Sequence, residues 1–400
     1  MKEYRDITWE NPNQQLWKLL RGFLEVDAVS KRIREIHGIT DKKSRADINK
    51  QALQIGYCIR QAQEYFQASA NVSLATRPLM IYYGVTSLST ALVLFRQDGS
   101  YSLDALRKNH KHQHHGLLLS RGSLQSVTNA HGVNDVLSVV DCNIKHLDGI
   151  PWGLFGLFFK SLIPCDFAIE NEIRDVGKSM LLKTFALHPC ADTVKIDDLA
   201  ETSFKAIELI KSLPDTFSML SDLGIGSYLI RGSVHQETIR SYKKDMGIEQ
   251  PEQIVERFNF FIDGISSEYK EAFIRNCKTR NENIKVASDL GSNIHLNLSL
   301  ELNPSSEASA YFIPDIFDDL NGKLYYPIPT KTYLPEPASL FILSFCLGMF
   351  SRYFPDLWMR LIDQDVQAAE AIDSLLNIIV RKFPNLILDQ MTEVKHHIHI

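Results

Sequence analysis

The sequence predicts a mainly α-helical fold of helical bundle domains, with a small antiparallel β-sheet inserted near residues 284–330. Apolar side chains recur every three or four residues through most of the chain, which is typical of helices that bury one face. Between Ile294 and Leu302 the period changes, and apolar and polar residues alternate as they do in a half-buried strand. The composition, 44% hydrophobic and 23% charged over 400 residues, is that of an ordinary folded protein.

Three long helices are predicted in the first hundred residues, at positions 13–37, 41–71 and 78–95. Gly38 is a typical helix-ending residue, and Pro78 suits a first helical turn, where a proline costs no hydrogen bond. The third segment is apolar, but polar residues interrupt it. We therefore interpret it as a buried core helix rather than a membrane span.

The middle of the chain carries weaker signals. We expect loops with short strands or helices over residues 116–150, where glycines occur repeatedly. A helix is predicted over residues 193–213, ending before Pro214. Residues 251–276 are predicted to form one or two helices.

Turn signals organise the last third of the chain. The pair Asn321-Gly322 is typical of a tight hairpin, so a strand is expected to follow it at residues 323–328. Three helical segments are predicted beyond the sheet, at residues 335–362, 365–382 and 384–391.

Charge and cysteine content narrow the class of protein. With a net charge of −5 the chain does not suit coating nucleic acid with its whole surface, so any nucleic-acid contact must use a local patch. The six cysteines form no CxxC pair, which argues against a zinc ribbon or thioredoxin-type site, and scattered cysteines are typical of a reducing cytoplasm. Because no apolar signal segment opens the sequence, we expect a cytoplasmic protein without a membrane partner.

Several stretches, taken together and in order, resemble the bacterial YaaC-like family. They are QAQEYFQASA at 61–70, RPLMIYYGV at 77–85, HGL at 115–117, VKIDDL at 194–199, IKSLP at 210–214, LSFCLGMFSRYFPDLW at 343–358 and KFPNLIL at 382–388. The resemblance implies a largely helical, cytosolic bacterial protein and brings no established reaction with it. The residues Arg352, Tyr353, Pro355 and Trp358 are interpreted as a structural corner at a helix end.

The N-terminal part also resembles, more loosely, the HEPN helical domains, whose ribonuclease members carry an arginine followed after four to six residues by a histidine. Here Arg107 follows a predicted helix, and His112 and His114 both stand at a fitting distance from it. The resemblance divides the chain into a HEPN-like N-terminal helical domain with a loop-rich extension, residues 1–190, and a second helical domain with the small sheet, residues 191–400.

The histidine cluster at these positions admits three interpretations. A histidine can accept and return a proton near neutral pH, and an arginine can stabilise charge on a phosphate, so Arg107, His112 and His114 are candidate catalytic residues of a metal-independent ribonuclease. The alternate histidines His110, His112 and His114 would instead face one metal ion if the segment were a strand. The interleaved lysine, asparagine and glutamine residues are equally typical of a solvated loop, and Arg32 and His37 show the same spacing within a predicted helix.

Two functions therefore remain open. In the first, the chain is a homodimeric ribonuclease effector of bacterial stress or antiviral defence, with RNA as its partner. In the second, it is a non-catalytic helical interaction module or scaffold subunit with a protein partner. The sequence holds no P-loop and no HExxH metalloprotease motif, and no cofactor or metal ion is expected.

Overall fold

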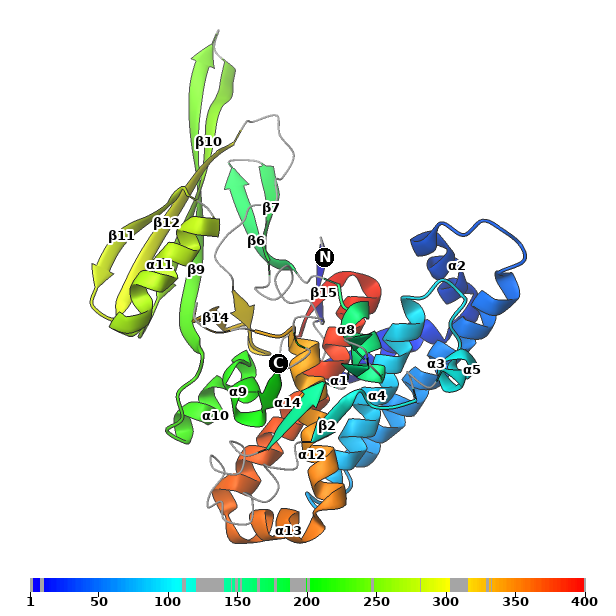
Figure 1. The fold of residues 1–400 in the computed structure, drawn as a ribbon. Coiled ribbons are helices and arrows are strands. Elements are labelled where there is room, and N and C mark those ends of the chain that lie inside the picture. The colour runs from blue at the N-terminus through cyan, green and yellow to red at the C-terminus, as the bar shows by residue number, and fades with distance from the viewer. Residues whose placement is uncertain are drawn as a thin grey trace.

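The computed structural model describes most of the chain, and its fold is mainly α-helical with small antiparallel sheets, as the sequence predicts (Figure 1). The described residues are 3–7, 11–109, 113–119, 140–144, 146–147, 150–151, 153–163, 166–175, 178–187, 199, 202–245, 248–280, 282–302, 316–328, 331 and 333–398.

The N-terminal helices are α1 (Pro12–Arg21), α2 (Val26–His37), α3 (Arg45–Ser69) and α4 (Arg77–Phe95). The prediction of one helix over residues 13–37 is wrong at its middle, because a 3-10 turn, Gly22–Leu24, separates α1 from α2. Phe23 in that turn is buried, and its ring meets the ring of Phe95 edge-on at 5.5 Å. Tertiary packing of this side chain thus overrides the continuous helical period.

The C-terminal helices are α12 (Glu336–Tyr353), α13 (Pro355–Gln364) and α14 (Val366–Thr392). The predicted helix over residues 335–362 is bent by 105° where α12 ends and α13 begins at Pro355. A proline fixes its own backbone angle and disfavours helix in the residue before it, which explains the break at Phe354. The break predicted before Pro384 does not occur. Helix α14 continues through this proline, and residues 382–391 of the helix are all buried.

Helix α4 lies at the centre of the helical body, where it packs against α3, α12, α14 and the short helix α8 (Leu154–Ser161). It is apolar on all sides, as expected of a helix that is surrounded by others. Among the described residues α4 is the one helix long and apolar enough to cross a membrane, and 72% of that stretch is buried inside the protein. This agrees with its interpretation as a core helix.

One hydrophobic cluster joins the N-terminal and the C-terminal helices. It contains, for example, Leu88 and Leu92 from α4, Ile55 from α3, Phe341 from α12 and Leu376 from α14, all without solvent exposure. The division of the chain between residues 190 and 191 stays a prediction, since this cluster draws on both sides of it.

Shorter elements surround the helical body. The helices are α5 (Leu103–Lys108), α9 (Ala206–Lys211), α10 (Phe217–Asp222) and a 3-10 turn, Pro214–Thr216. The strands are β1 (Glu3–Ile7), parallel to β15 (Val394–Ile398); β2 (Leu117–Leu119), β3 (Asp141–Ile144) and β8 (Ser203–Lys205) in one sheet; and the pairs β4 (His146–Leu147) with β5 (Ile150–Pro151) and β6 (Asp166–Asp175) with β7 (Lys178–Leu187). The helix predicted over residues 193–213 begins only at Ala206, and residues 191–198 lie outside the described residues.

A six-stranded antiparallel sheet lies beside the helical body (Figure 1). Its strands are β9 (Leu229–Asp245), β10 (Ile248–Ile262), β11 (Ile284–Leu290), β12 (Asn293–Leu302), β13 (Phe317–Asp318) and β14 (Leu324–Pro327), in the order β11-β12-β10-β9-β14-β13. The strand over residues 294–302 and the hairpin around Asn321-Gly322 are confirmed. The sheet begins at Leu229, well before residue 284.

Residues 251–276 correct the helix prediction made for them. Strand β10 occupies this segment up to Ile262, and only α11 (Ser267–Arg280) is helical. Phe258, Phe260 and Ile262 are fully buried on one side of β10, so the governing period is two rather than 3.6. Strands β9 and β10 also continue past β12, which pairs with β10 only from Ile254 onward, and their hairpin projects from the sheet (Figure 1).

Close approach of α12 to α4 depends on Gly348. A methyl group at Gly348 would lie 2.9 Å from the Cβ atom of Tyr82, closer than real side chains come. We expect Gly348→Ala to lower the free energy of unfolding by about 1–3 kcal/mol, because the two helices must move apart. Urea unfolding followed by circular dichroism measures this change.

The matched control is Gly22→Ala. Gly22 has helical backbone angles and open space around it, so the added methyl should leave the stability unchanged or raise it by less than about 1 kcal/mol. Equal losses in both variants would contradict the role given to Gly348.

Candidate functional site

The predicted catalytic residue Arg107 lies in the last turn of α5, whose first turn is capped by the hydroxyl of Ser102. Its side chain is 76% exposed, and its nearest carboxylate is that of Asp104 at 4.0 Å. His112 lies outside the described residues, and His114 is exposed in the loop that follows. The catalytic role of these three residues stays a prediction.

A hydrogen bond closes the loop between Arg107 and His114. The side-chain amide of Gln113 donates to the backbone carbonyl of Arg107, so the chain returns to the end of α5 directly before His114. Arg107 and His114 thus belong to one surface turn, although six residues separate them in the sequence.

The next residue, His115, is held by the core of the protein. The hydroxyl of Tyr82 in α4 lies 2.6 Å from Nδ1 of His115. Tyr82 is fully buried, and burial raises its pKa. The phenol therefore stays protonated and acts as the hydrogen-bond donor to the imidazole. We therefore assign neutral His115 the tautomer with its proton on Nε2.

Burial lowers the pKa of His115, and electrostatic interactions with Arg352 and His114 lower it further. The ring is consequently neutral at pH 7 and presents an Nε2–H donor. An exposed hydrogen-bond donor beside an arginine suits an anionic ligand such as a phosphate group.

The start of α8 fixes the backbone of this loop. The amides of Leu154 and Phe155 donate to the carbonyls of His114 and His115, at 2.8 and 3.0 Å. Gly153 has a φ of +89°, and a side chain there would collide with the backbone of Gly116. His114 and His115 are therefore held by three elements: the end of α5, Tyr82 of α4 and the start of α8.

Arg352, whose charge acts on His115, contacts two tyrosines. Arg352 Nη1 donates to the hydroxyl of Tyr83 at 3.3 Å, and the Arg352 guanidinium lies 5.0 Å from the ring centre of Tyr353. The rings of Tyr65 and Tyr83 are 5.4 Å apart. We call this set the histidine–tyrosine patch; it consists of Tyr65, Tyr83, His114, His115, Arg352 and Tyr353.

The corner interpretation of the α12–α13 junction holds for only part of it. Trp358 is buried, and its indole N–H donates to the carbonyl of Leu74 at 2.9 Å. Arg352 and Tyr353 instead face solvent, and Tyr353 is 59% exposed. No sequence signal links them to His115, because the contact joins residues more than 200 positions apart.

Arg107 of α5 lies beside α3, at a distance along the α3 axis from the histidine–tyrosine patch. Burial raises the pKa of the Cys58 thiol to about 12, and the charge of Arg107 partly opposes this rise, which places Arg107 near Cys58. Cys58 and Tyr65 are separated by seven residues of α3, or about 10 Å of helix. Arg107 thus lies about two turns of α3 away from Tyr65, and a cation near aromatic rings is a combination suited to phosphates and bases.

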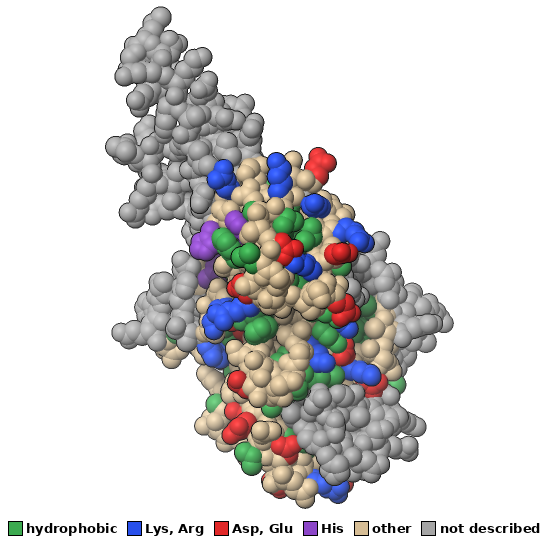
Figure 2. Space-filling model, turned by 90° about the vertical axis from the view of Figure 1, so that its left-hand side faces the viewer, with side chains coloured by type: hydrophobic (Ala, Val, Ile, Leu, Met, Phe, Trp, Pro, Cys, Tyr) green, Lys and Arg blue, Asp and Glu red, His purple; other side chains and the backbone are tan. Residues whose placement is uncertain are grey.

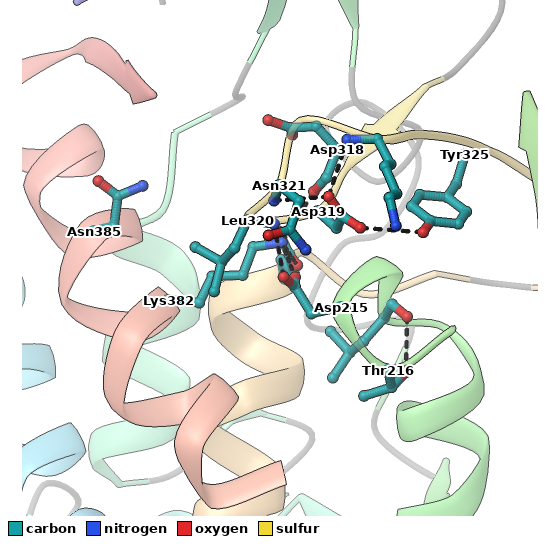
Figure 3. A network of polar contacts seen from close by, with 12 residues as sticks. Asp215, Thr216, Asp318, Asp319, Leu320, Asn321, Tyr325, Lys382 and Asn385 are labelled. Carbon is teal, nitrogen blue, oxygen red and sulfur yellow. Dashed lines mark hydrogen bonds and ion pairs between the residues drawn. The ribbon is translucent and has the colours of Figure 1, made fainter. Parts of the chain in front are cut away.

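A second polar cluster is buried where α14 meets the sheet (Figure 3). The ammonium group of Lys382 pairs with the carboxylates of Asp215 and Glu336 and donates to the carbonyl of Asp318 at 3.0 Å. Asp215 also accepts the amide of Leu320 at 2.8 Å. All three charged side chains are less than 10% exposed.

Hydrogen bonds extend this cluster in both directions. Asp319 accepts the amides of Asn321 and Lys323 and the hydroxyl of Tyr325, which fixes the β13–β14 turn (Figure 3). On the other side, Asp389 accepts from the buried ring of His396 at 2.9 Å. The cavity between these groups has a volume of about 40 Å³, enough for roughly one water molecule by the usual measure. We therefore interpret the cluster as a cross-link between helices and sheet rather than a substrate site.

The described residues contain no group of three or more histidine, cysteine, aspartate or glutamate side chains placed to hold a metal ion. His110 and His112, on which the metal interpretation of the sequence depends, lie outside the described residues.

The fold and these two clusters define a mainly helical protein with a lateral sheet. The family model described as YaaC-like Protein matches residues 23–391 of the sequence. The chain therefore belongs to the YaaC-like family. No curated protein and no solved structure matches it, so the looser resemblance to HEPN domains gains no support from these comparisons.

The buried cation at Lys382 has a measurable consequence. We expect Lys382→Met to lower the free energy of unfolding by about 3–5 kcal/mol, because it leaves buried carboxylates without their partner. Adding Asp215→Asn should recover part of this loss, since it removes a buried negative charge. Lys278→Met, at an exposed position of α11, is the control for the loss of a lysine. Comparable losses of stability in Lys382→Met and Lys278→Met would contradict the role given to Lys382.

Glu336 predicts a dependence of stability on pH. Burial raises its pKa from 4.5 to about 7, and Lys382 only partly opposes the rise. Between these two values the folded protein binds more protons at Glu336 than the unfolded chain does, so its contribution to stability falls as the pH rises from 4.5 to 7.

Glu336→Gln should remove this part of the pH dependence. Urea unfolding at pH 5 and pH 7.5 should show the wild type losing on the order of 2 kcal/mol relative to Glu336→Gln. Glu271→Gln, at an exposed position of α11, serves as the control. Parallel pH profiles for wild type and Glu336→Gln would refute the assignment.

Proposed function

We propose that the protein is a cytoplasmic RNA-binding protein that cleaves RNA without a metal ion. The observation that supports this best is the surface turn that joins Arg107 to His114, next to the histidine–tyrosine patch with His115 and Arg352. Arginine and histidine donors suit phosphates, and exposed aromatic rings suit unpaired bases. A role in bacterial stress or antiviral defence rests on the HEPN resemblance alone.

The proposed reaction is a transesterification within the RNA strand. A neutral histidine, His112 or His114, takes the proton of a ribose 2′-hydroxyl while the 2′-oxygen attacks the neighbouring phosphorus. The bond from phosphorus to the 5′-oxygen breaks, and a protonated histidine gives its proton to that oxygen. Arg107 stabilises the negative charge of the intermediate state. The products end in a 2′,3′-cyclic phosphate and a 5′-hydroxyl.

A homodimer is part of this proposal. HEPN ribonucleases pair two such motifs across an interface, so the second histidine of each site comes from the partner copy. We also propose that the helical body is a bundle into which the sheet is inserted, and that residues 1–190 and 191–400 form two domains.

The second candidate is a non-catalytic interaction module with a protein partner. The hairpin β9–β10, which projects from the sheet, favours it (Figure 1). Projecting two-stranded ribbons are only marginally stable alone, so a partner that pairs with or covers this one would stabilise it. The net charge of −5 also suits a protein partner better than extended RNA.

Cleavage of RNA in EDTA distinguishes the two candidates. The variants Arg107→Ala, His112→Ala and His114→Ala are compared with the wild type. We expect the wild type to release fragments with 2′,3′-cyclic phosphate ends. Loss of a general acid or base should slow cleavage by about 10²–10⁴-fold. Loss of the group that stabilises the developing charge should slow it by about 10²–10³-fold, so at least His112→Ala and Arg107→Ala should be inactive in practice.

The control is His37→Ala. Arg32 and His37 have the same sequence spacing as Arg107 and His112, but they lie within α2, and His37 is exposed. Its removal should leave cleavage unchanged. If no variant alters the cleavage rate, the activity is a contaminant; if the wild type does not cleave at all, the interaction module becomes the better candidate.

A further inference from the structure

The six-stranded sheet has two faces of different chemistry. One face packs on α11, where Phe258, Phe260 and Ile262 of β10 join Phe273 and Cys277 in a buried cluster. The alternate residues of β9, β10, β11 and β12 point to the opposite side. We call this the outer sheet face; it is formed by Arg231, Ser233, His235, Arg257, Asn259, Phe261, Lys285, His295, Asn297 and Ser299.

Three aromatic rings from neighbouring strands meet on the outer sheet face. The rings of Phe261 and His295 are stacked, with centres 4.4 Å apart and planes at 15°. The ring of His235 meets Phe261 edge-on at 5.4 Å. Figure 2, which views the molecule from the side of the sheet, shows histidine side chains next to hydrophobic ones, with both basic and acidic side chains around them. A nucleobase is a further flat ring that can join such a group by stacking.

Beside the rings lies a ladder of amide and hydroxyl groups. Oδ1 of Asn259 accepts from Asn297 Nδ2 at 3.0 Å and lies 3.1 Å from Nε2 of His295. The hydroxyl of Ser299 in turn donates to Oδ1 of Asn297 at 3.0 Å. These bonds fix the orientation of both amides. Asn259 is buried, whereas Asn297 is partly exposed. Oriented amides of this kind recognise the edges of bases.

Two exposed side chains of this face are positive, namely Arg231 and Lys285. Arg257 lies opposite Glu237 in the register of β9 and β10. Asp289 of β11 pairs with Lys270 of α11 and so belongs to the other face. Within an acidic protein, this local cationic rim complements a phosphate backbone.

From this arrangement we propose that the outer sheet face binds a single strand of nucleic acid. The rings of Phe261 and His295 stack on unpaired bases, Asn297 contacts base edges, and Arg231 and Lys285 contact phosphates. A duplex is a poorer occupant, because its bases are already stacked and paired. The inference stands without the proposed cleavage, since none of these residues belongs to the histidine–tyrosine patch.

Fluorescence anisotropy with a labelled single-stranded RNA of twelve nucleotides tests the proposal. The full-length protein carries Arg107→Ala throughout, so that any cleavage at the other site does not consume the probe. In this background Phe261→Leu should weaken binding roughly tenfold or more, because it removes a stacking ring. Phe261→Tyr keeps the ring and should bind as the parent does, which separates stacking from a general effect on folding.

Charge variants on the two faces give an independent comparison. Lys285→Gln should weaken binding and reduce the dependence of log Kd on log salt concentration by about one. Lys278→Gln, on exposed α11 at the other face, should change neither quantity. Equal effects of the two lysine variants, unchanged binding by Phe261→Leu, equal affinity for duplex RNA, or no RNA binding at all would each overturn the proposal.

Discussion

The rest of the structure depends on the pairing of one buried cation, Lys382. Burial alone would lower the pKa of this lysine, but the charges of Asp215 and Glu336 outweigh that effect and keep it protonated. A buried ammonium group must stay with its carboxylates, so α14, α12 and the 3-10 turn at Asp215 are held at one point (Figure 3). Through Asp318 and the turn fixed by Asp319, the same point anchors the sheet.

Close packing of α4 and α12 fixes the orientation of side chains at the surface. Gly348 lets the helices approach until Tyr82 is completely enclosed, and the enclosed hydroxyl orients His115. Arg352, one turn beyond Gly348, then lies beside the same imidazole. The protonation state of an exposed side chain is therefore decided by the apolar core behind it. This is why the histidine–tyrosine patch should be sensitive to changes in helix packing.

Both proposed binding surfaces carry positive charges, although the protein as a whole is acidic. On the helical side, Arg352 contacts Tyr83 and Tyr353; on the sheet, Arg231 and Lys285 share a face with Phe261 and His295. Exposed rings flanked by cations suit flexible, single-stranded nucleic acid, since bases and phosphates can be engaged separately. Salt would weaken such contacts strongly, because each phosphate neutralised releases counterions. Weak binding at high salt is therefore consistent with either surface.

The sequence by itself determined the elements whose hydrophobic period is local: α3, α4, the strand over residues 293–302 and the hairpin at Asn321-Gly322. It also sufficed for membership of the family. The bend at Pro355 was marked by its proline, but the turn at Phe23 and strand β10 were decided by tertiary packing. The contacts of His115 with Tyr82 and Arg352, and of Lys382 with Asp215 and Glu336, were decided only by the tertiary structure. They join residues far apart in the chain, and periodicity reports the face of a helix or strand, not which distant side chain will meet it.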